Sequence, residues 1–196
     1  FNKYYEILNH VGYIPGEIAL PAGLTGKAFL QMMQDLQGVH NNEQLKKMLD
    51  LFELDDVALS GETKRMSLGV KRKLAVVAAF MSDPDVLILD EPTSGLDPVM
   101  QEVFVKLIHE EKERGKTILL SSHIFSEVDS TCDRIAIIKD GKIVSEFVAN
   151  DLKHASRKFY NVEFANKTAK IAFVKKCKTL SSLNLIKDDE KEVFLS

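Results

Sequence analysis

Residues 86–97 read VLILDEPTSGLD. The first four of them form an apolar run with an aspartate on each side, which is typical of a buried strand in a parallel sheet. Two adjacent carboxylates, Asp90 and Glu91, follow at the C-terminal end of this predicted strand. Ligands of open α/β sheets bind beyond that end of the strands. The two carboxylates are therefore the leading candidates for a functional site.

The two residue types suit phosphate chemistry. A carboxylate such as Asp90 at the end of a strand can hold Mg²⁺, usually through water. The neighbouring Glu91 can orient or deprotonate an attacking water. An isolated Asp-Glu pair most often marks a solvated turn, but the surrounding twelve residues favour a catalytic site.

Strands and helices alternate around this stretch. Residues 11–14 and 117–120 read as further buried strands, and an amphipathic helix is expected around residues 100–108. A helix is expected to start at Ser67 and to run to about residue 81. This order predicts an α/β domain with a mostly parallel sheet.

Helical and hairpin signals complete the first 150 residues. Residues 24 to about 52 read as helical, with Thr25 as a candidate N-cap and Gly38 as a break. Residues 124–132 read as a short helix. Two further apolar runs flank Asp140-Gly141, a strong signal for a β-hairpin.

The tail differs from the rest of the chain. Residues 151–196 carry 10 basic and 6 acidic side chains, whereas the first 150 residues are net acidic. The tail reads as a strand at 160–164, a helix at 169–177 and a strand at 192–195. We therefore expect a domain of residues 1–150 and a small β-α-β appendage at 151–196.

Composition excludes several classes of protein. With 196 residues, 45% hydrophobic and 28% charged, the chain can bury a core and is not wholly disordered. The longest apolar run, residues 74–81, is too short to span a bilayer. A pI near 6.0 gives no electrostatic reason to expect a nucleic-acid partner. Two cysteines without a CxxC pair predict reduced thiols and no zinc site.

Three motifs together carry a family resemblance. Residues 86–97, MSLGVK at 66–71 and SSH at 121–123 closely resemble the nucleotide-binding domain of ATP-binding cassette (ABC) transporters, over roughly residues 1–150. The resemblance implies a P-loop NTPase-like, mostly parallel sheet. It also implies a helical subdomain at about 24–80 that abuts a membrane partner.

The resemblance also implies roles for single residues. Asp90 matches the Walker B residue that binds Mg²⁺, and Glu91 matches the catalytic base. Asp97 lies in the segment that matches the D-loop, which crosses the dimer interface. His123 matches the switch histidine that contacts the γ-phosphate of ATP.

The signature motif is degenerate here. The usual pattern is Leu-Ser-Gly-Gly-Gln, of which this chain keeps Ser67 and Gly69 but has Leu68 and Val70 at two other places. A serine N-cap leaves helix N–H groups that attract phosphate, and a glycine allows a close approach. A plain capped core helix remains the alternative. The 23-residue spacing to Asp90 favours the signature motif, and KRK at residues 71–73 resembles the export-type branch.

The segment that matches the Q-loop also departs from the family pattern. GYIP at residues 12–15 fits its approach, but Gly16 stands where the family usually has Gln. Glu17 follows, either as a contact to Mg²⁺ or water or as a surface residue.

No P-loop pattern occurs in the chain. Gly115-Lys116-Thr117 resembles its end, but Glu110 stands at the first glycine position and the segment runs from helix into strand. We therefore expect the sequence to be N-terminally truncated, with the backbone cradle for the β- and γ-phosphates outside it.

The resemblance implies an ATP-hydrolysing subunit of an exporter-type transporter, acting with a membrane permease at the cytoplasmic face of the membrane. Two subunits, identical or not, would sandwich ATP, and no nucleic acid would be bound. This part of the protein alone is expected to be inactive. The alternatives are a non-transport ABC ATPase of translation or DNA repair and a non-enzymatic fragment.

Overall fold

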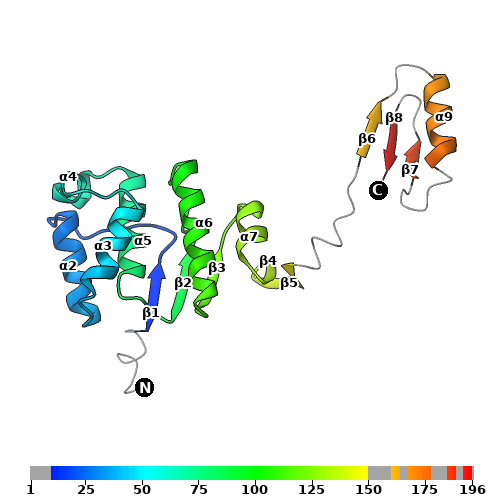
Figure 1. Ribbon diagram of the computed structural model, residues 1–196. Coiled ribbons are helices and arrows are strands. Elements are labelled where there is room, and N and C mark those ends of the chain that lie inside the picture. Colours follow the sequence, from blue (N-terminus) through cyan, green and yellow to red (C-terminus); the bar gives the residue numbers. More distant parts are fainter. Residues whose placement is uncertain (1–9, 150–159, 164–166, 178–184, 189–191, 196) are drawn as a thin grey trace. The chain divides into compact units, whose positions relative to one another are not determined.

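A computed structural model describes residues 10–149, 160–163, 167–177, 185–188 and 192–195 (Figure 1). The chain divides into two compact units, Phe1–Cys132 and Asp133–Ser196.

A parallel sheet organises the first unit. It consists of β1 (Val11–Ile14), β2 (Val86–Asp90) and β3 (Thr117–Ser121), in the order β1-β2-β3. The register aligns Ile14 with Leu89 and Leu89 with Leu120, so the C-terminal ends of all three strands meet at one edge. The predicted α/β fold with a parallel sheet is confirmed.

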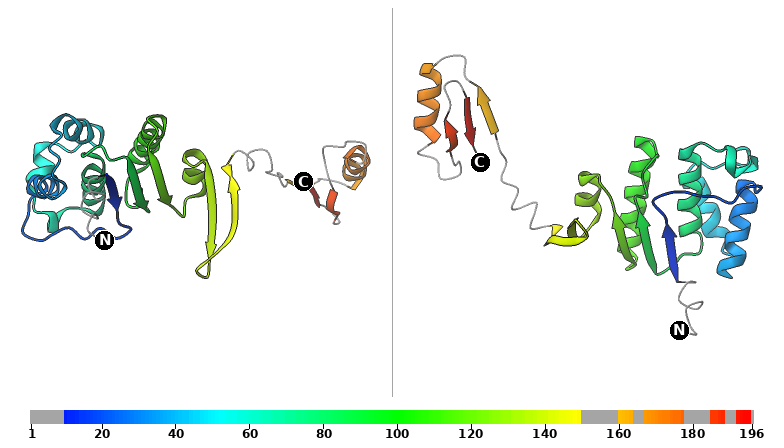
Figure 2. Two further views of the ribbon diagram at one scale, coloured as in Figure 1. Left: turned by 90° about the horizontal axis from the view of Figure 1, so that it is seen from below. Right: turned by 180° about the vertical axis from the view of Figure 1, so that it is seen from behind.

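Two crossover helices cover one face of this sheet (Figure 2). They are α5 (Leu68–Phe80), the last helix before β2, and α6 (Pro98–Glu113), which connects β2 to β3. The face that they cover carries Leu87 and Leu89, which are at most 1% exposed. Residues 74–81 of α5 and its C-cap are buried without exception. Burial on this scale is the main source of stability in the unit.

A group of shorter helices precedes α5. They are α2 (Gly26–Gln37), α3 (Asn42–Leu51), α4 (Asp56–Ser60) and the 3₁₀ helix η1 (Thr63–Arg65). Of these, α2 and α3 pack against α5, and α4 packs against α2. Thr25 caps α2 by accepting a hydrogen bond from the N–H of Ala28, and Gly38 ends the helix with φ of 64°. The helical region predicted from residue 24 is therefore present as separate helices.

The other face of the sheet carries a row of apolar side chains. Tyr13, Ile88 and Leu119 are aligned across the three strands and are 58%, 38% and 66% exposed. Among the described residues, no strand pairs with the second edge of β3. This face and this edge are therefore accessible in the first unit.

A short helix and a hairpin follow β3 in the chain. Helix α7 (Phe125–Thr131) confirms the short helix predicted at residues 124–132, and it is the last element of the first unit. In the second unit, β4 (Arg134–Lys139) and β5 (Lys142–Val148) pair antiparallel. Asp140 and Gly141 at the turn have φ of 50° and 72°, as a two-residue hairpin turn of type I′ requires. The hairpin prediction is confirmed.

The tail has one strand more than predicted. Its elements are β6 (Tyr160–Glu163), α9 (Lys167–Cys177), β7 (Leu185–Asp188) and β8 (Glu192–Leu195). The strands form an antiparallel sheet in the order β6-β8-β7, so the appendage is β-α-β-β. The extra strand, LIKD, is too short and too mixed in polarity to give a clear alternation. The domain boundary predicted at residue 150 falls on residues 150–159, outside the described residues.

None of the helices that the structure describes combines the length and the apolar character needed to cross a bilayer.

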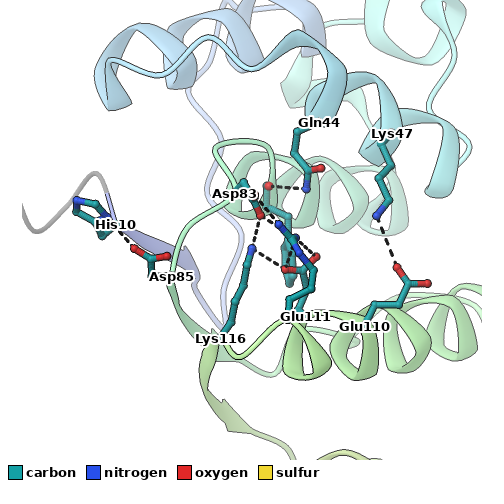
Figure 3. A network of polar contacts seen from close by, with 10 residues as sticks. His10, Gln44, Lys47, Asp83, Asp85, Glu110, Glu111 and Lys116 are labelled. Carbon is teal, nitrogen blue, oxygen red and sulfur yellow. Dashed lines mark hydrogen bonds and ion pairs between the residues drawn. The ribbon is translucent and has the colours of Figure 1, made fainter.

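A partly buried ionic network joins the end of α6 to the loop between α5 and β2 (Figure 3). Asp83 accepts hydrogen bonds from Arg114, at 2.8 and 2.6 Å, and from Lys116. Glu111 has no exposed surface and lies 2.9 Å from Arg114 and 2.5 Å from Lys116. The hydrogen bonds from Arg114, followed by those from Lys116, lower the pKa of Asp83 to about 2. The two cations thus stabilise the ionised form of Asp83.

Replacing Asp83 by Asn tests this network. The side chain keeps its shape and tolerates the φ of 56° at this position, but the charge is lost. We expect Asp83→Asn to lower the free energy of unfolding by about 1–2 kcal/mol at pH 7. Because the pKa is depressed in the folded state, this contribution exists above the unfolded value near 4 and disappears as the pH falls through 2. Urea unfolding at pH 3 should therefore show about half the effect.

Glu110→Gln is the matched control, because its ion pair with Lys47 is exposed on both sides. This change should alter the free energy of unfolding by less than about 0.5 kcal/mol. An equal effect of the two substitutions, or an Asp83→Asn effect that is independent of pH, would show that the network does not stabilise the fold.

Candidate functional site

The two carboxylates are held by the end of the neighbouring strand. Asp90 is paired with Ser121 across the β2–β3 ladder. The hydroxyl of Ser121 donates to Asp90 Oδ1 at 2.5 Å, and its oxygen accepts from the N–H of Glu91 at 3.2 Å. The N–H of Glu91 also lies 3.1 Å from the carbonyl of Ser121. One serine thereby orients both acidic residues.

Glu91 and His123 are in direct contact. Glu91 has φ of 47°, which non-glycine residues rarely adopt and which is often found at functional sites. Its Oε2 lies 2.6 Å from Nδ1 of His123. The histidine side chain is 73% exposed and that of Glu91 is 31% exposed, so both face solvent. Asp90, Glu91 and His123 therefore form one accessible group at the edge of the sheet.

The loop after β1 touches the same group through its backbone. A Cβ atom at Gly16 would lie 2.8 Å from Asp90 Oδ2, so the carboxylate occupies the space of a side chain. The next residue, Glu17, is exposed. The structure thus places Gly16 against Asp90 and leaves the side chain of Glu17 in solvent.

The start of α5 contacts the loop after β2. Ser67 is the N-cap of α5, accepts a hydrogen bond from the N–H of Val70 at 3.3 Å and is exposed. A Cβ at Gly69 would lie 3.2 Å from the carbonyl oxygen of Gly95. The first turn of α5 therefore packs on the loop after β2, and Ser67 faces solvent.

Asp97 is the N-cap of α6, as Ser67 is of α5. Its carboxylate caps the helix by accepting from the N–H of Met100 at 3.0 Å. The residue is exposed. Helix capping accounts for an aspartate at this position, and exposure leaves it accessible to a second molecule.

A buried glutamate links two loops around the site. Glu127 of α7 is 5% exposed, and its Oε2 accepts hydrogen bonds from Thr93 at 3.1 Å and from Ser122 at 2.6 Å. Thr93 belongs to the loop after β2 and Ser122 to the loop after β3. Our sequence analysis missed this role. The available signal was an acidic residue four positions after His123.

A separate cavity of about 440 Å³ lies between α6 and α7. Its lining includes Gln101, Lys106 and Ser130 but none of the three residues of the carboxylate–histidine group. It is therefore not the candidate catalytic site.

Known proteins resemble this chain in sequence and in fold. A family model described as an AAA domain, putative AbiEii toxin, Type IV TA system, matches residues 36–129. The bacitracin transport ATP-binding protein BcrA of Bacillus licheniformis is 34% identical over 179 residues, which is 89% of this chain and 57% of BcrA. The chain is thus similar to ABC transporter ATP-binding proteins. It spans little more than half the length of this relative.

Solved ABC structures agree with the fold. The structure of an ATP-binding subunit of an ABC transporter matches with a TM-score of 0.69 and 27% identity, covering 78% of this chain and 65% of that one. A dimeric ATP-binding cassette, MJ0796, bound to ADP and Pi has a TM-score of 0.67 at 21% identity, covering 76% and 67%. The second likeness supports the ABC ATPase fold alone.

Substitution of Gly16 tests the packing at this edge of the sheet. Ala at position 16 must displace the Asp90 carboxylate, which Ser121 holds in place. We expect Gly16→Ala to lower the free energy of unfolding by about 1–2 kcal/mol, as crowding in a packed site does. Urea unfolding of the variant measures this effect.

Gly61→Ala is the control for this substitution. Only the carbonyl of Ala58 lies near its Cβ position, at 3.8 Å, and its φ of −69° suits alanine. We expect no loss of stability, or a small gain from the lower entropy of the unfolded chain. A neutral Gly16→Ala variant would contradict the close approach to Asp90.

Proposed function

We propose that the protein is the ATP-binding and ATP-hydrolysing subunit of an exporter-type ABC transporter. The observation that carries the proposal is the contact between Glu91 and His123 beside Asp90, at the C-terminal edge of a parallel sheet. Similarity to a bacitracin transport ATP-binding protein supports transport as the process that ATP drives.

The three residues have distinct roles in this proposal. Asp90 holds Mg²⁺, since an exposed carboxylate is a hard oxygen ligand that suits this ion. When bound, Mg²⁺ would neutralise charge on the phosphates. Glu91 orients the attacking water and accepts its proton. His123 keeps the Glu91 carboxylate in place through Nδ1 and faces the γ-phosphate. Glu17 supplies a further contact to Mg²⁺ or water.

A complete site needs two subunits in this proposal. Ser67 and Gly69 of one subunit face the ATP that is bound at the carboxylate edge of the other, and Asp97 lies at the interface. The exposed N-cap of α5 supports this role, because free N–H groups and the helix dipole attract phosphate. The second subunit is another copy or a related chain, as in the solved dimeric cassette.

The remaining partner is a membrane permease. We propose that the helical subdomain at residues 24–80 contacts it, which places the protein at the cytoplasmic face of the membrane. No nucleic-acid partner is part of this function.

The cradle for the β- and γ-phosphates is proposed to come from residues outside the printed sequence, which contains no P-loop pattern. The chain of residues 1–196 should then bind ATP only weakly, with a Kd above about 1 mM, and show no turnover. Isothermal titration with MgATP measures this affinity. A micromolar Kd for MgATP would show that the described loops bind ATP without a cradle from other residues.

The role of Glu91 is tested in the complete protein. We expect Glu91→Gln to reduce kcat for ATP hydrolysis by about 10²–10⁴-fold, the usual scale for a lost general base. Glu110→Gln serves as the control, since Glu110 is an exposed residue of α6. Near-normal turnover of the Glu91→Gln variant would show that Glu91 is not the general base. A wild-type protein without ATPase activity would overturn the proposed function.

A further inference from the structure

Arg72 bonds to two loops of the site at once. It lies in α5 and is 2% exposed, one of the largest fully buried side chains. Its Nε donates to the carbonyl of Ser94 at 2.9 Å, its Nη1 to that of Pro15 at 3.0 Å, and its Nη2 to that of Gly16 at 2.7 Å. Pro15 and Gly16 follow β1, and Ser94 follows β2.

Burial of a guanidinium is costly unless its donors are satisfied. Here three backbone carbonyls accept from it, and its charge lies near the two carboxylates of the site. Burial lowers the pKa of Arg72, and the charges of Asp90 and then Glu91 act in the opposite direction. The side chain remains protonated because the ordinary pKa of arginine is far above neutral pH.

The contact with Gly16 connects the loop after β1 to the rest of the site. Position 16 has no side chain, and its Cβ position is filled by the Asp90 carboxylate. The connection from this loop to the rest of the site therefore runs through its backbone carbonyl and Arg72. Among the described residues, no other side chain donates to both loops.

Arg72 also connects the loops to the start of α5. The first turn of that helix packs on the loop after β2, where a Cβ at Gly95 would lie 2.9 Å from Leu68. One turn further along, Arg72 bonds to Ser94 in the same loop. Helix α5 thus packs against the loop after β2. Through Arg72 it also makes hydrogen bonds to the loops after β1 and β2.

We propose that Arg72 is a positioning residue that joins the loops after β1 and β2 to α5, so that all three move as one unit. Its planar fork of donors spans three acceptors, which the single ammonium of a lysine cannot do. The catalytic consequence rests on the proposed function. Since Arg72 is 2% exposed and bonds to three backbone carbonyls, it orients the site without touching nucleotide.

Hydrogen exchange tests the mechanical part. Arg72→Lys keeps the charge but not the fork, and Arg72→Met removes both. In the complete protein we expect the amides of residues 12–20 and 91–96, two segments that include hydrogen-bonded amides of β1 and of the loop after β2, to exchange at least about 10-fold faster in both variants, and together. Lys73→Met is the matched control, because Lys73 is the next residue of α5 and is only partly buried. It should leave both segments unchanged.

Steady-state kinetics tests the catalytic part. For Arg72→Lys we expect kcat to fall by about 10–100-fold while KM for MgATP changes by less than about 3-fold. A general loss of structure would instead lower the Tm and the fraction of active protein, and it would not combine a lower kcat with normal Tm and a nearly unchanged KM. If Arg72→Met fails to fold, Arg72→Lys decides the question.

The outcomes separate the two proposals. Unchanged exchange in Arg72→Lys, or faster exchange in one loop only, would overturn the coupling. Faster exchange of both loops with normal kcat would overturn the positioning role. A wild-type protein without ATPase activity would refute the proposed function, while the exchange experiment would still decide whether Arg72 joins the loops.

Discussion

The burial of α5 is the constraint on which the first unit depends. One side of the helix lies on the sheet and the other meets α2 and α3, so residues 74–81 have almost no solvent contact. Close approach is possible because Gly12 of β1 lacks a side chain, and a Cβ there would lie 2.3 Å from the Ala79 carbonyl. This packing fixes where α5 begins, and with it the position of Ser67 and of the loop after β2.

The site has an exposed layer and a buried one. Asp90, Glu91 and His123 face solvent, where they can meet a ligand. Behind them, Arg72 and Glu127 hold the adjoining loops through backbone carbonyls and hydroxyl groups. Hydrogen bonds from buried charged groups restrict a loop more than exposed ones do, because low local polarity strengthens them. The loops can therefore be irregular in shape and still be well positioned.

Features set by local patterns could be predicted from the sequence. The apolar run of β2, the caps Thr25 and Ser67 and the turn at Asp140-Gly141 each depend on a few adjacent residues. The role of Arg72 could not be predicted in this way, because its acceptors lie 22 to 57 positions away in the chain. The same applies to Glu127, whose partner Thr93 is 34 positions distant. For these residues only the folded structure shows which groups meet.

The strand register has a consequence for how such a chain can change. Side chains alternate between the two faces of a strand, so inserting or deleting one residue within β2 would move Asp90 to the opposite face. Ser121 would then lose its partner and the core would lose Leu87 and Leu89. Length changes are therefore confined to the connections, and the distance from Val86 to Asp90 is as tightly constrained as the identity of the residues.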